Sequence, residues 1–100
     1  MIEVQLSPSA RADLVDIRHY SMAQFDADTA DAYFLGFEAA FDRLSEHPHA
    51  GAATPQYGKP YRCLVHRKHR IFYTVEGERV LIVRILHHAR NAKGMLGEAK

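Results

Sequence analysis

The sequence predicts an α+β domain with the element order β-α-α-β-β-β, in which a helical hairpin packs on one face of a small sheet. Two observations support this class. Apolar residues recur at helical spacing up to about residue 47, and they alternate with a period of two from residue 61 onward. With 100 residues, 47% of them hydrophobic and 25% charged, the chain is also typical of one folded domain over residues 1–100.

The chain begins with a predicted strand and a predicted helix. Ile2–Leu6 alternates apolar with polar side chains, as a half-buried strand does. Ser7 followed by Pro8 is typical of an N-cap and a first helical position, because the hydroxyl accepts an unpaired N–H and proline has none to leave unpaired. The helix is expected to run to about Phe25, with an apolar stripe of Ala10, Leu14, Ile17 and Tyr20.

A second helix is predicted after the polar break FDADTAD, with Asp28 as its cap. Its apolar stripe is expected in the core and contains Ala30, Tyr33, Phe34, Phe37, Phe41 and Leu44. Pro48 disfavours helical geometry at the residue before it and so ends the helix. With about four linking residues, the two helices are expected to form an antiparallel hairpin over residues 8–47.

Three strands are predicted in the C-terminal half. Residues 48–60 are rich in Gly, Pro and Ala and are expected to form a loop, whose length hints at binding. The period-two segments that follow, within residues 61–87, are Tyr61–Val65, Arg70–Val75 and Val80–Leu86. Their close connections predict an antiparallel meander, followed by a tail or short helix over residues 90–100. The sheet face opposite the helices is left to solvent or a partner.

Charge is divided unevenly along the chain. Residues 1–56 hold nine acidic and three basic residues, a balance of −6, whereas residues 57–93 hold nine basic and two acidic residues, a balance of +7. Such asymmetry within a small domain favours a basic face directed at an anionic partner. The alternative is that the positive side chains only keep an exposed sheet soluble.

No motif for metal, nucleophilic or phosphate-loop chemistry is present. The sequence contains neither HExxH nor paired CxxC, and neither GxSxG nor GxxxxGK[ST]. Adjacent residues on a strand point to opposite faces, so His87 and His88 are not expected to share a metal ion. Cys63 is the only cysteine, which rules out an internal disulfide. We therefore expect no metal and no cofactor.

The N-terminus does not predict secretion or membrane insertion. It carries an acidic residue and lacks the apolar segment of a signal peptide. No apolar run approaches the roughly 18 residues that suggest a membrane span. We therefore expect a cytoplasmic protein without a membrane partner.

The basic residues and histidines of the C-terminal half could in principle support metal-independent cleavage of a phosphodiester bond. Its cations could come from Lys68, Arg70, Arg84 and Arg90, and His87 or His88 could carry a proton. By strand alternation Arg70 shares a face with Phe72, while Arg84 lies on the face of Ile82 and Leu86 and is either a structural cation or a site residue. No acidic residue lies between residues 47 and 75, so a carboxylate base would have to come from elsewhere. The set is incomplete for a nuclease.

Three blocks of sequence resemble one family. These are SPSARADLVDIRHY at residues 7–20, the segment 47–75 with HRIFY near its end, and VLIVRILHHARN at residues 80–91. In this order they resemble the ParE toxins of bacterial type II toxin–antitoxin systems, within the RelE/ParE superfamily. With the second helix, the resemblance covers nearly the whole chain.

The resemblance implies a toxin that is neutralised by a cognate antitoxin, ParD-like or similar, through an acidic amphipathic segment. ParE-type toxins are described as poisons of DNA gyrase, which makes gyrase the expected target, with no direct sequence-specific DNA binding. The alternatives are a RelE-like ribosome-dependent mRNA endoribonuclease and a non-toxic homologue that only binds its antitoxin. Arg70 and Arg90 match two arginines of RelE-like members, but the terminal tyrosine common in that group has no match here.

The candidate residues follow from the charge division and the resemblance. If the protein is a ribonuclease, the catalytic candidates are Arg70, Arg90, His87 and His88. A basic surface for target or antitoxin is expected from Arg62, Arg67, Lys68, Arg70, His87 and Arg90. Apolar candidates for antitoxin contact are Leu14, Ile17, Tyr20 and Phe34.

Overall fold

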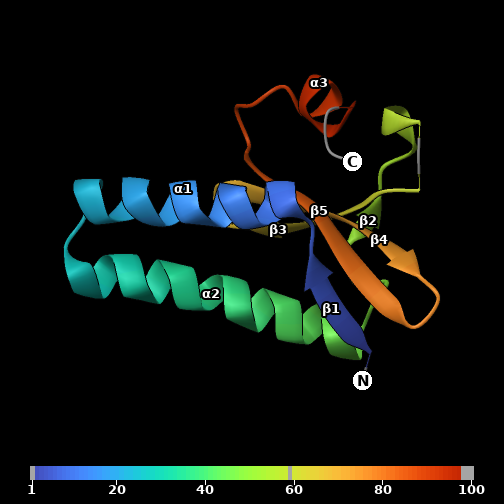
Figure 1. Ribbon diagram of the computed structural model, residues 1–100, viewed down its shortest axis with the longest axis horizontal. Coiled ribbons are helices and arrows are strands. Elements are labelled where there is room, and N and C mark those ends of the chain that lie inside the picture. The colour runs from blue at the N-terminus through green and yellow to red at the C-terminus, as the bar shows by residue number, and fades with distance from the viewer. Residues whose placement is uncertain (1, 59, 98–100) are drawn as a thin grey trace.

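The computed structural model describes residues 2–58 and 60–97, and the predicted α+β class is confirmed (Figure 1). The elements in chain order are β1 (Glu3–Leu6), α1 (Pro8–Gln24), α2 (Ala27–Glu46), β2 (Ala52–Ala53), the 3-10 turn η1 (Pro55–Tyr57), β3 (Arg62–His66), β4 (His69–Glu76), β5 (Arg79–His87) and α3 (Ala92–Gly97). Lys59 of the predicted loop and residues 98–100 of the predicted tail lie outside the described residues.

The strands form a five-stranded sheet in the order β1-β5-β4-β3-β2. The meander β3-β4-β5 is antiparallel, as predicted, and β1 adds to the edge of β5 in parallel. The predicted loop 48–60 is more ordered than its sequence indicates, because it contains the two-residue strand β2, paired with β3, and η1.

The two helices form the predicted hairpin, but their connection is shorter than expected. Ser7 caps α1 by accepting the N–H of Ala10 at 3.0 Å. The expectation that Asp28 caps α2 is wrong, because Asp26 does so by accepting the N–H of Thr29 at 2.7 Å. Only residues 25–26 therefore link the helices. Asp28 lies in the first turn of α2, where its negative charge interacts favourably with the positive end of the helix dipole. No helix among the described residues is long and apolar enough to cross a membrane.

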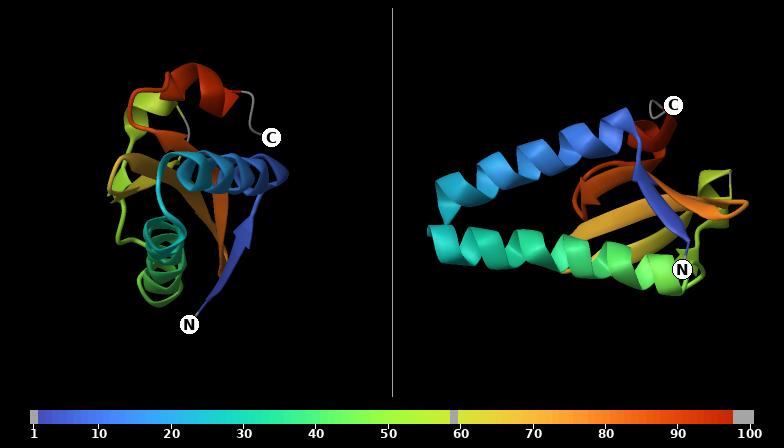
Figure 2. Two further views of the ribbon diagram at one scale, coloured as in Figure 1. Left: turned by 90° about the vertical axis from the view of Figure 1, so that its left-hand side faces the viewer. Right: turned by 60° about the horizontal axis from the view of Figure 1, so that its bottom comes forward.

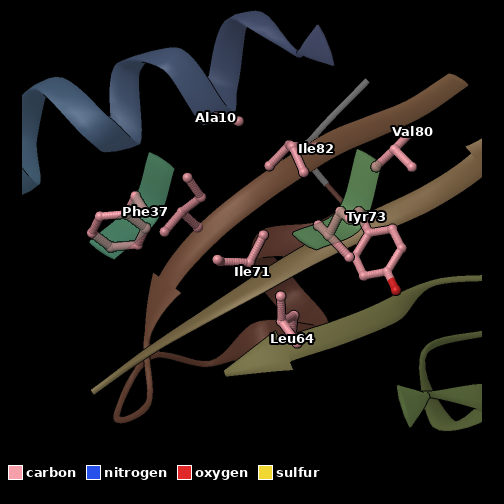
Figure 3. Packing of buried hydrophobic residues seen from close by; sticks show 9 residues of the cluster. Ala10, Phe37, Leu64, Ile71, Tyr73, Val80 and Ile82 are labelled. Carbon is pink, nitrogen blue, oxygen red and sulfur yellow. The ribbon is translucent and has the colours of Figure 1, made fainter. Parts of the chain in front are cut away.

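The hairpin covers one sheet face and extends beyond the end of the sheet (Figure 2). The main core lies between helices and sheet, where Phe37 and Leu44 of α2 meet Ile71, Tyr73 and Ile82 of β4 and β5, all at most 1% exposed (Figure 3). Burial of such side chains contributes roughly 1.5–3 kcal/mol each. The stripe predicted for α2 is confirmed at Phe37 and Leu44.

A second, smaller core covers part of the opposite sheet face. Its buried members are Tyr61, Phe72, Val83, Leu86, Ala92 and Leu96. The expectation that this face is left to solvent or a partner is wrong in part, because α3 and the segment around η1 fold over it.

An irregularity in β5 changes the faces assigned from strand alternation. Phe72 pairs with Arg84, but Tyr73 pairs with Ile82, so Val83 is an extra residue in β5. Ile82 therefore belongs to the main core and Leu86 to the second core. The expectation that Ile82 and Leu86 lie together on the face of Arg84 is therefore wrong for Ile82, which the extra residue moves to the opposite face.

The two histidines after β5 also depart from strand alternation. β5 ends at His87, so His88 already belongs to the following turn. Their rings lie side by side with centroids 4.4 Å apart, and the expectation that they point to opposite faces is wrong.

Candidate functional site

A groove of about 680 Å³ lies where the helical hairpin extends past the end of the sheet. Its walls are the last turn of α1, the first turns of α2, the β3–β4 turn and the end of β5. The lining residues are Tyr20, Ser21, Phe25, Asp28, Thr29, Ala32, Tyr33, Arg67, Lys68, His69 and His87. One wall is therefore mainly apolar and the other is basic.

The apolar wall exposes two aromatic side chains. Tyr20 is 65% exposed and Phe25 is 54% exposed. Phe25 is the C-cap residue of α1, where the chain turns into the short link, so its ring gains no place in the core. Large apolar side chains that remain open beside a groove are typical of a binding surface.

The basic wall is the two-residue turn between β3 and β4. His66 pairs with His69, which leaves Arg67 and Lys68 at the tip. Arg67 has φ of 55°, a left-handed conformation that disfavours any residue with a Cβ. Its guanidinium lies 6.0 Å from the ring centroid of Tyr33. Glycine would relieve the backbone strain at this position, so the turn holds the Arg67 side chain at an energetic cost.

The floor of the groove joins Tyr33, His69 and His87. Burial, followed by the neighbouring His87, His66 and His88, lowers the pKa of His69 to about 4. Burial also raises the pKa of Tyr33. At neutral pH the hydrogen bond between the Tyr33 hydroxyl and Nδ1 of His69 therefore joins two neutral groups. His69 supports the floor and is a poor proton carrier at this pH.

His87 lies on the same floor and faces several cations. Its ring centroid is 5.4 Å from that of His69. Partial burial, and then the charges of His88, Lys68 and Arg90, lower the pKa of His87. Lys68 and Arg90 therefore place positive charge near His87 at this end of the groove.

Arg70 is occupied by contacts within the fold. It shares a face with Phe72, as predicted, and its guanidinium lies 5.3 Å from that ring. Its Nη2 donates to the carbonyl oxygens of His88 at 3.3 Å and Arg90 at 3.0 Å, and Nη1 lies 3.4 Å from the Tyr57 hydroxyl. Arg70 thus holds the turn after β5 in place.

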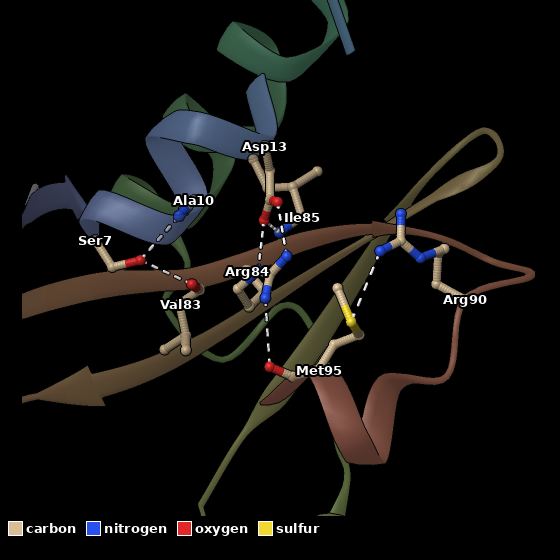
Figure 4. A network of polar contacts seen from close by, with 8 residues as sticks. All are labelled: Ser7, Ala10, Asp13, Val83, Arg84, Ile85, Arg90 and Met95. Carbon is tan, nitrogen blue, oxygen red and sulfur yellow. Dashed lines mark hydrogen bonds and ion pairs between the residues drawn. The ribbon is translucent and has the colours of Figure 1, made fainter. Parts of the chain in front are cut away.

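Arg84 forms an ion pair with a helix. Its Nε and Nη2 each donate to the carboxylate of Asp13 at 2.8 Å, and both side chains are 12% exposed (Figure 4). Its Nη1 donates to the carbonyl oxygen of Met95 at 3.3 Å. The sequence left Arg84 as either a structural cation or a site residue, and these contacts identify it as a structural cation.

The remaining basic candidates lie apart from one another. Arg90 is exposed, and its Nη2 lies 3.7 Å from the sulfur of Met95 (Figure 4). Arg62 donates to the carbonyl oxygens of Gly51 at 2.7 Å and His49 at 3.4 Å, at the end of β3 opposite the Arg67 turn. The structure brings Arg67, Lys68 and His87 together at the groove and places Arg62 elsewhere.

The four apolar candidates divide in a similar way. Tyr20 lines the groove, whereas Leu14 and Ile17 pack against the main core. Phe34 is half-buried, with the guanidinium of Arg18 4.9 Å from its ring centroid. Sequence reasoning missed Phe25 and assigned Tyr33 to the core only. An aromatic residue beside the cap of a second helix is the signal that could have found Phe25.

The arrangement suits binding better than proton transfer. The imidazole of His69 is neutral and hydrogen-bonded, and the Nη2 group of Arg70 donates to two backbone carbonyl oxygens. Within residues 2–58 and 60–97, no group of three or more His, Cys, Asp or Glu side chains could hold a metal ion. What the groove offers is exposed aromatic surface next to cations.

Comparisons with known proteins agree on one family. Residues 4–92 match the family described as "ParE toxin of type II toxin-antitoxin system, parDE". The chain is 37% identical over 93 residues to "Toxin ParE1" of Caulobacter vibrioides, covering 93% of this chain and 96% of the relative. It is 35% identical to "Toxin ParE1" of Mycobacterium tuberculosis, covering 82% and 85%. The solved structure "Chromosomal ParDE TA system from P. aeruginosa" has the same fold, with a TM-score of 0.74, 21% identity and coverage of 87% and 96%.

Proposed function

Because the chain belongs to the ParE toxin family of type II toxin–antitoxin systems, we propose that an acidic amphipathic segment of a ParD-like antitoxin binds its groove and that its target is DNA gyrase in the cytoplasm. The observation that supports antitoxin binding is that exposed Tyr20 and Phe25 lie on one wall of the groove and Arg67 and Lys68 lie on the opposite wall. A bound segment that places apolar side chains against the aromatic wall and carboxylates against the basic wall would complement both walls of the groove.

Energetic considerations support this partner chemistry. Aromatic anchors in a desolvated pocket contribute at least about 2 kcal/mol each at many protein interfaces. A charge-assisted hydrogen bond from Arg67 to a carboxylate adds roughly 1.5–3 kcal/mol. Neither Arg67 nor Lys68 has a carboxylate partner among the ion pairs of the described residues, so both are available for such contacts.

The gyrase part of the proposal rests on family membership and on the lack of a proton-transfer set. The RelE-like alternative needs Arg70, Arg90 and a histidine to act on RNA. Arg70 instead donates to backbone carbonyl oxygens, and burial together with the charges of His88, Lys68 and Arg90 lowers the pKa of the candidate His87. These contacts favour a toxin that acts by binding. A homologue that only binds its antitoxin is the remaining alternative.

The antitoxin proposal is tested by binding measurements on groove variants. The probe is the small acidic protein encoded beside the toxin gene, titrated against purified toxin by calorimetry. We expect Tyr20→Ala and Arg67→Gly to weaken binding at least tenfold each, which is about 1.4 kcal/mol. Val15→Ala is the matched control, because Val15 is 50% exposed on α1 but does not line the groove. Equal losses for Val15 and Tyr20 would contradict the assignment.

The target proposal is tested with purified gyrase. We expect the toxin to inhibit supercoiling or to raise the amount of cleaved DNA complex. Arrested translation with unaffected gyrase, and codon-phased mRNA cuts that disappear in Arg90→Ala, would instead establish the RelE-like alternative. Expression without growth arrest would favour the homologue that only binds its antitoxin.

A further inference from the structure

Two turns that lie side by side at the end of the sheet carry basic residues. The β3–β4 turn carries Arg67 and Lys68, and the turn after β5 carries His88 and Arg90. The backbone N–H of His88 donates to the carbonyl oxygen of Lys68 at 2.8 Å, which fixes one turn against the other. We call these four residues the two-turn ridge. All four side chains are exposed.

The ridge has no counter-charge of its own. The three ion pairs found among residues 2–58 and 60–97 are Arg18–Asp31, Arg79–Glu76 and Arg84–Asp13. The sequence has no acidic residue between residues 47 and 75, nor between residues 80 and 97. Asp28, across the groove, is the one carboxylate among the groove residues. The ridge is therefore cationic on its outer side.

The shape of the ridge is fixed from beneath. Arg70 donates to the carbonyl oxygens of His88 and Arg90 and so holds the second turn, while adding a further positive charge below it. The cations repel one another, and the charges of His88, Lys68 and Arg90 help to lower the pKa of His87. A rigid cluster of like charges is stabilised by an anion that spans it.

The side chains of the ridge distinguish between two kinds of anionic partner. The only apolar side chain among residues 88–90 is that of Ala89, and the other turn has none. An acidic amphipathic peptide would leave its apolar face in water here, whereas it finds aromatic side chains in the groove. A phosphodiester backbone presents regularly spaced charge and needs no apolar contact. We propose that the two-turn ridge binds the phosphodiester backbone of nucleic acid without reading its sequence.

The ridge and the groove share Arg67 and Lys68. If the groove takes the acidic segment of an antitoxin, as proposed above, two ridge cations are neutralised at the same time. Antitoxin and nucleic acid then compete for the toxin. Only this consequence rests on the proposed function, since backbone binding itself is measured on the free protein.

The test is fluorescence anisotropy with a labelled 20-base-pair DNA duplex of mixed sequence. Three permanent cations on the ridge give an expected slope of log affinity against log salt of about −2.7, or about 40-fold weaker binding at 200 mM than at 50 mM salt. Lys68→Gln and Arg90→Gln should each reduce the slope by about 0.9. Arg43→Gln, at the far end of α2, removes the same charge from an exposed site and should leave the slope unchanged.

Two further probes identify the chemistry that is recognised. A single-stranded RNA of the same sequence should also bind, and its affinity should fall in the Lys68 and Arg90 variants. Whichever of the DNA duplex and the RNA binds more tightly is identified as the source of the phosphates. Poly-L-glutamate of matched charge should compete at least tenfold less well. No duplex or RNA binding at 50 mM salt, an equal loss in Arg43→Gln, or equally tight binding of poly-L-glutamate would overturn the proposal. Melting curves of each variant verify that the exposed substitutions leave the fold intact.

Discussion

The carboxylate of Asp13 on α1 accepts the backbone N–H of Ile85 on β5 at 2.9 Å, in addition to its ion pair with Arg84. β1 pairs with β5 only as far as Ile82, so the edge of β5 beyond that residue has no strand partner on that side. Ser7 donates its hydroxyl to the carbonyl oxygen of Val83 at 2.7 Å and thereby completes the same edge. Side chains from the start of α1 therefore provide hydrogen bonds to the edge of β5 beyond the point where its pairing with β1 ends.

Replacing Asp13 by alanine should lower the free energy of unfolding by about 3–5 kcal/mol, because the change leaves a nearly buried Arg84 without its counter-charge. Asp13→Asn keeps an acceptor for the N–H of Ile85 and should lose less. Urea unfolding at pH 7 measures both. Asp31→Ala removes an exposed partner of Arg18 and should change the free energy by less than about 1 kcal/mol. Equal effects at Asp13 and Asp31 would contradict this account.

Local patterns predicted the elements well. The Ser7–Pro8 cap, the stripe of α2 and the three meander strands are all signalled within a few residues of sequence, and the structure confirms them. What local patterns could not predict depends on distant contacts. The extra residue at Val83 is stabilised by Ser7, which is 76 residues away, and β2 exists only because β3 lies beside it.

The candidate site was predicted less completely than the fold, for a related reason. Counting charges along residues 57–93 identified Arg67 and Lys68, but it could not distinguish them from Arg84, whose partner is on α1. Likewise, Arg62 and Arg70 look free in the sequence, whereas each donates from one terminal nitrogen to backbone carbonyl oxygens. Arginine content predicts a basic surface only after internal partners are known.

The hydroxyl of Tyr73 predicts a stability cost that is independent of packing. Tyr73 is fully buried and donates to the carbonyl oxygen of Pro48 at 2.7 Å, while it accepts the N–H of Gly51 at 2.8 Å. Tyr73→Phe keeps the ring but leaves both backbone groups unpaired, so the free energy of unfolding should fall by about 1–3 kcal/mol. Chemical unfolding provides the measurement. Tyr20→Phe, at an exposed site, should leave stability unchanged, and a similar loss there would argue against the buried hydroxyl as the cause.

The lowered pKa of His69 predicts that stability falls in mild acid. The pKa of about 4 in the folded protein lies below the ordinary value of 6.5, so the unfolded chain binds the proton more readily between these values. The contribution of His69 is therefore complete above pH 6.5 and is lost as the pH falls toward 4, by up to about 3 kcal/mol. His69→Gln, which retains a hydrogen-bonding group for Tyr33, should show a smaller loss of stability than the natural protein between pH 7.5 and pH 4.5. Identical losses would mean that other groups cause the pH dependence.

Gly36 and His66 provide a test in which the effect of one substitution on stability should change sign when the other residue is replaced. Gly36 lies in the middle of α2, where glycine is about 1 kcal/mol less favourable than alanine. A Cβ at this position would overlap the Cε1 and Nε2 atoms of His66. That ring cannot move away freely, because it packs on Tyr33 and Phe37 with centroid distances of 5.1 and 4.6 Å and its Nε2 lies 3.2 Å from the carbonyl oxygen of Tyr33.

Gly36→Ala should therefore destabilise the natural protein by about 1–3 kcal/mol, as overpacking does, despite the higher helix propensity of alanine. In a His66→Ala background the space is open, and the same change should stabilise the protein by up to about 1 kcal/mol. The double-mutant cycle, measured by urea unfolding, should give a coupling energy of at least about 1 kcal/mol. Stabilisation by Gly36→Ala in both backgrounds would show that the His66 ring does not need the space above Gly36. The glycine would then have no packing reason to interrupt α2.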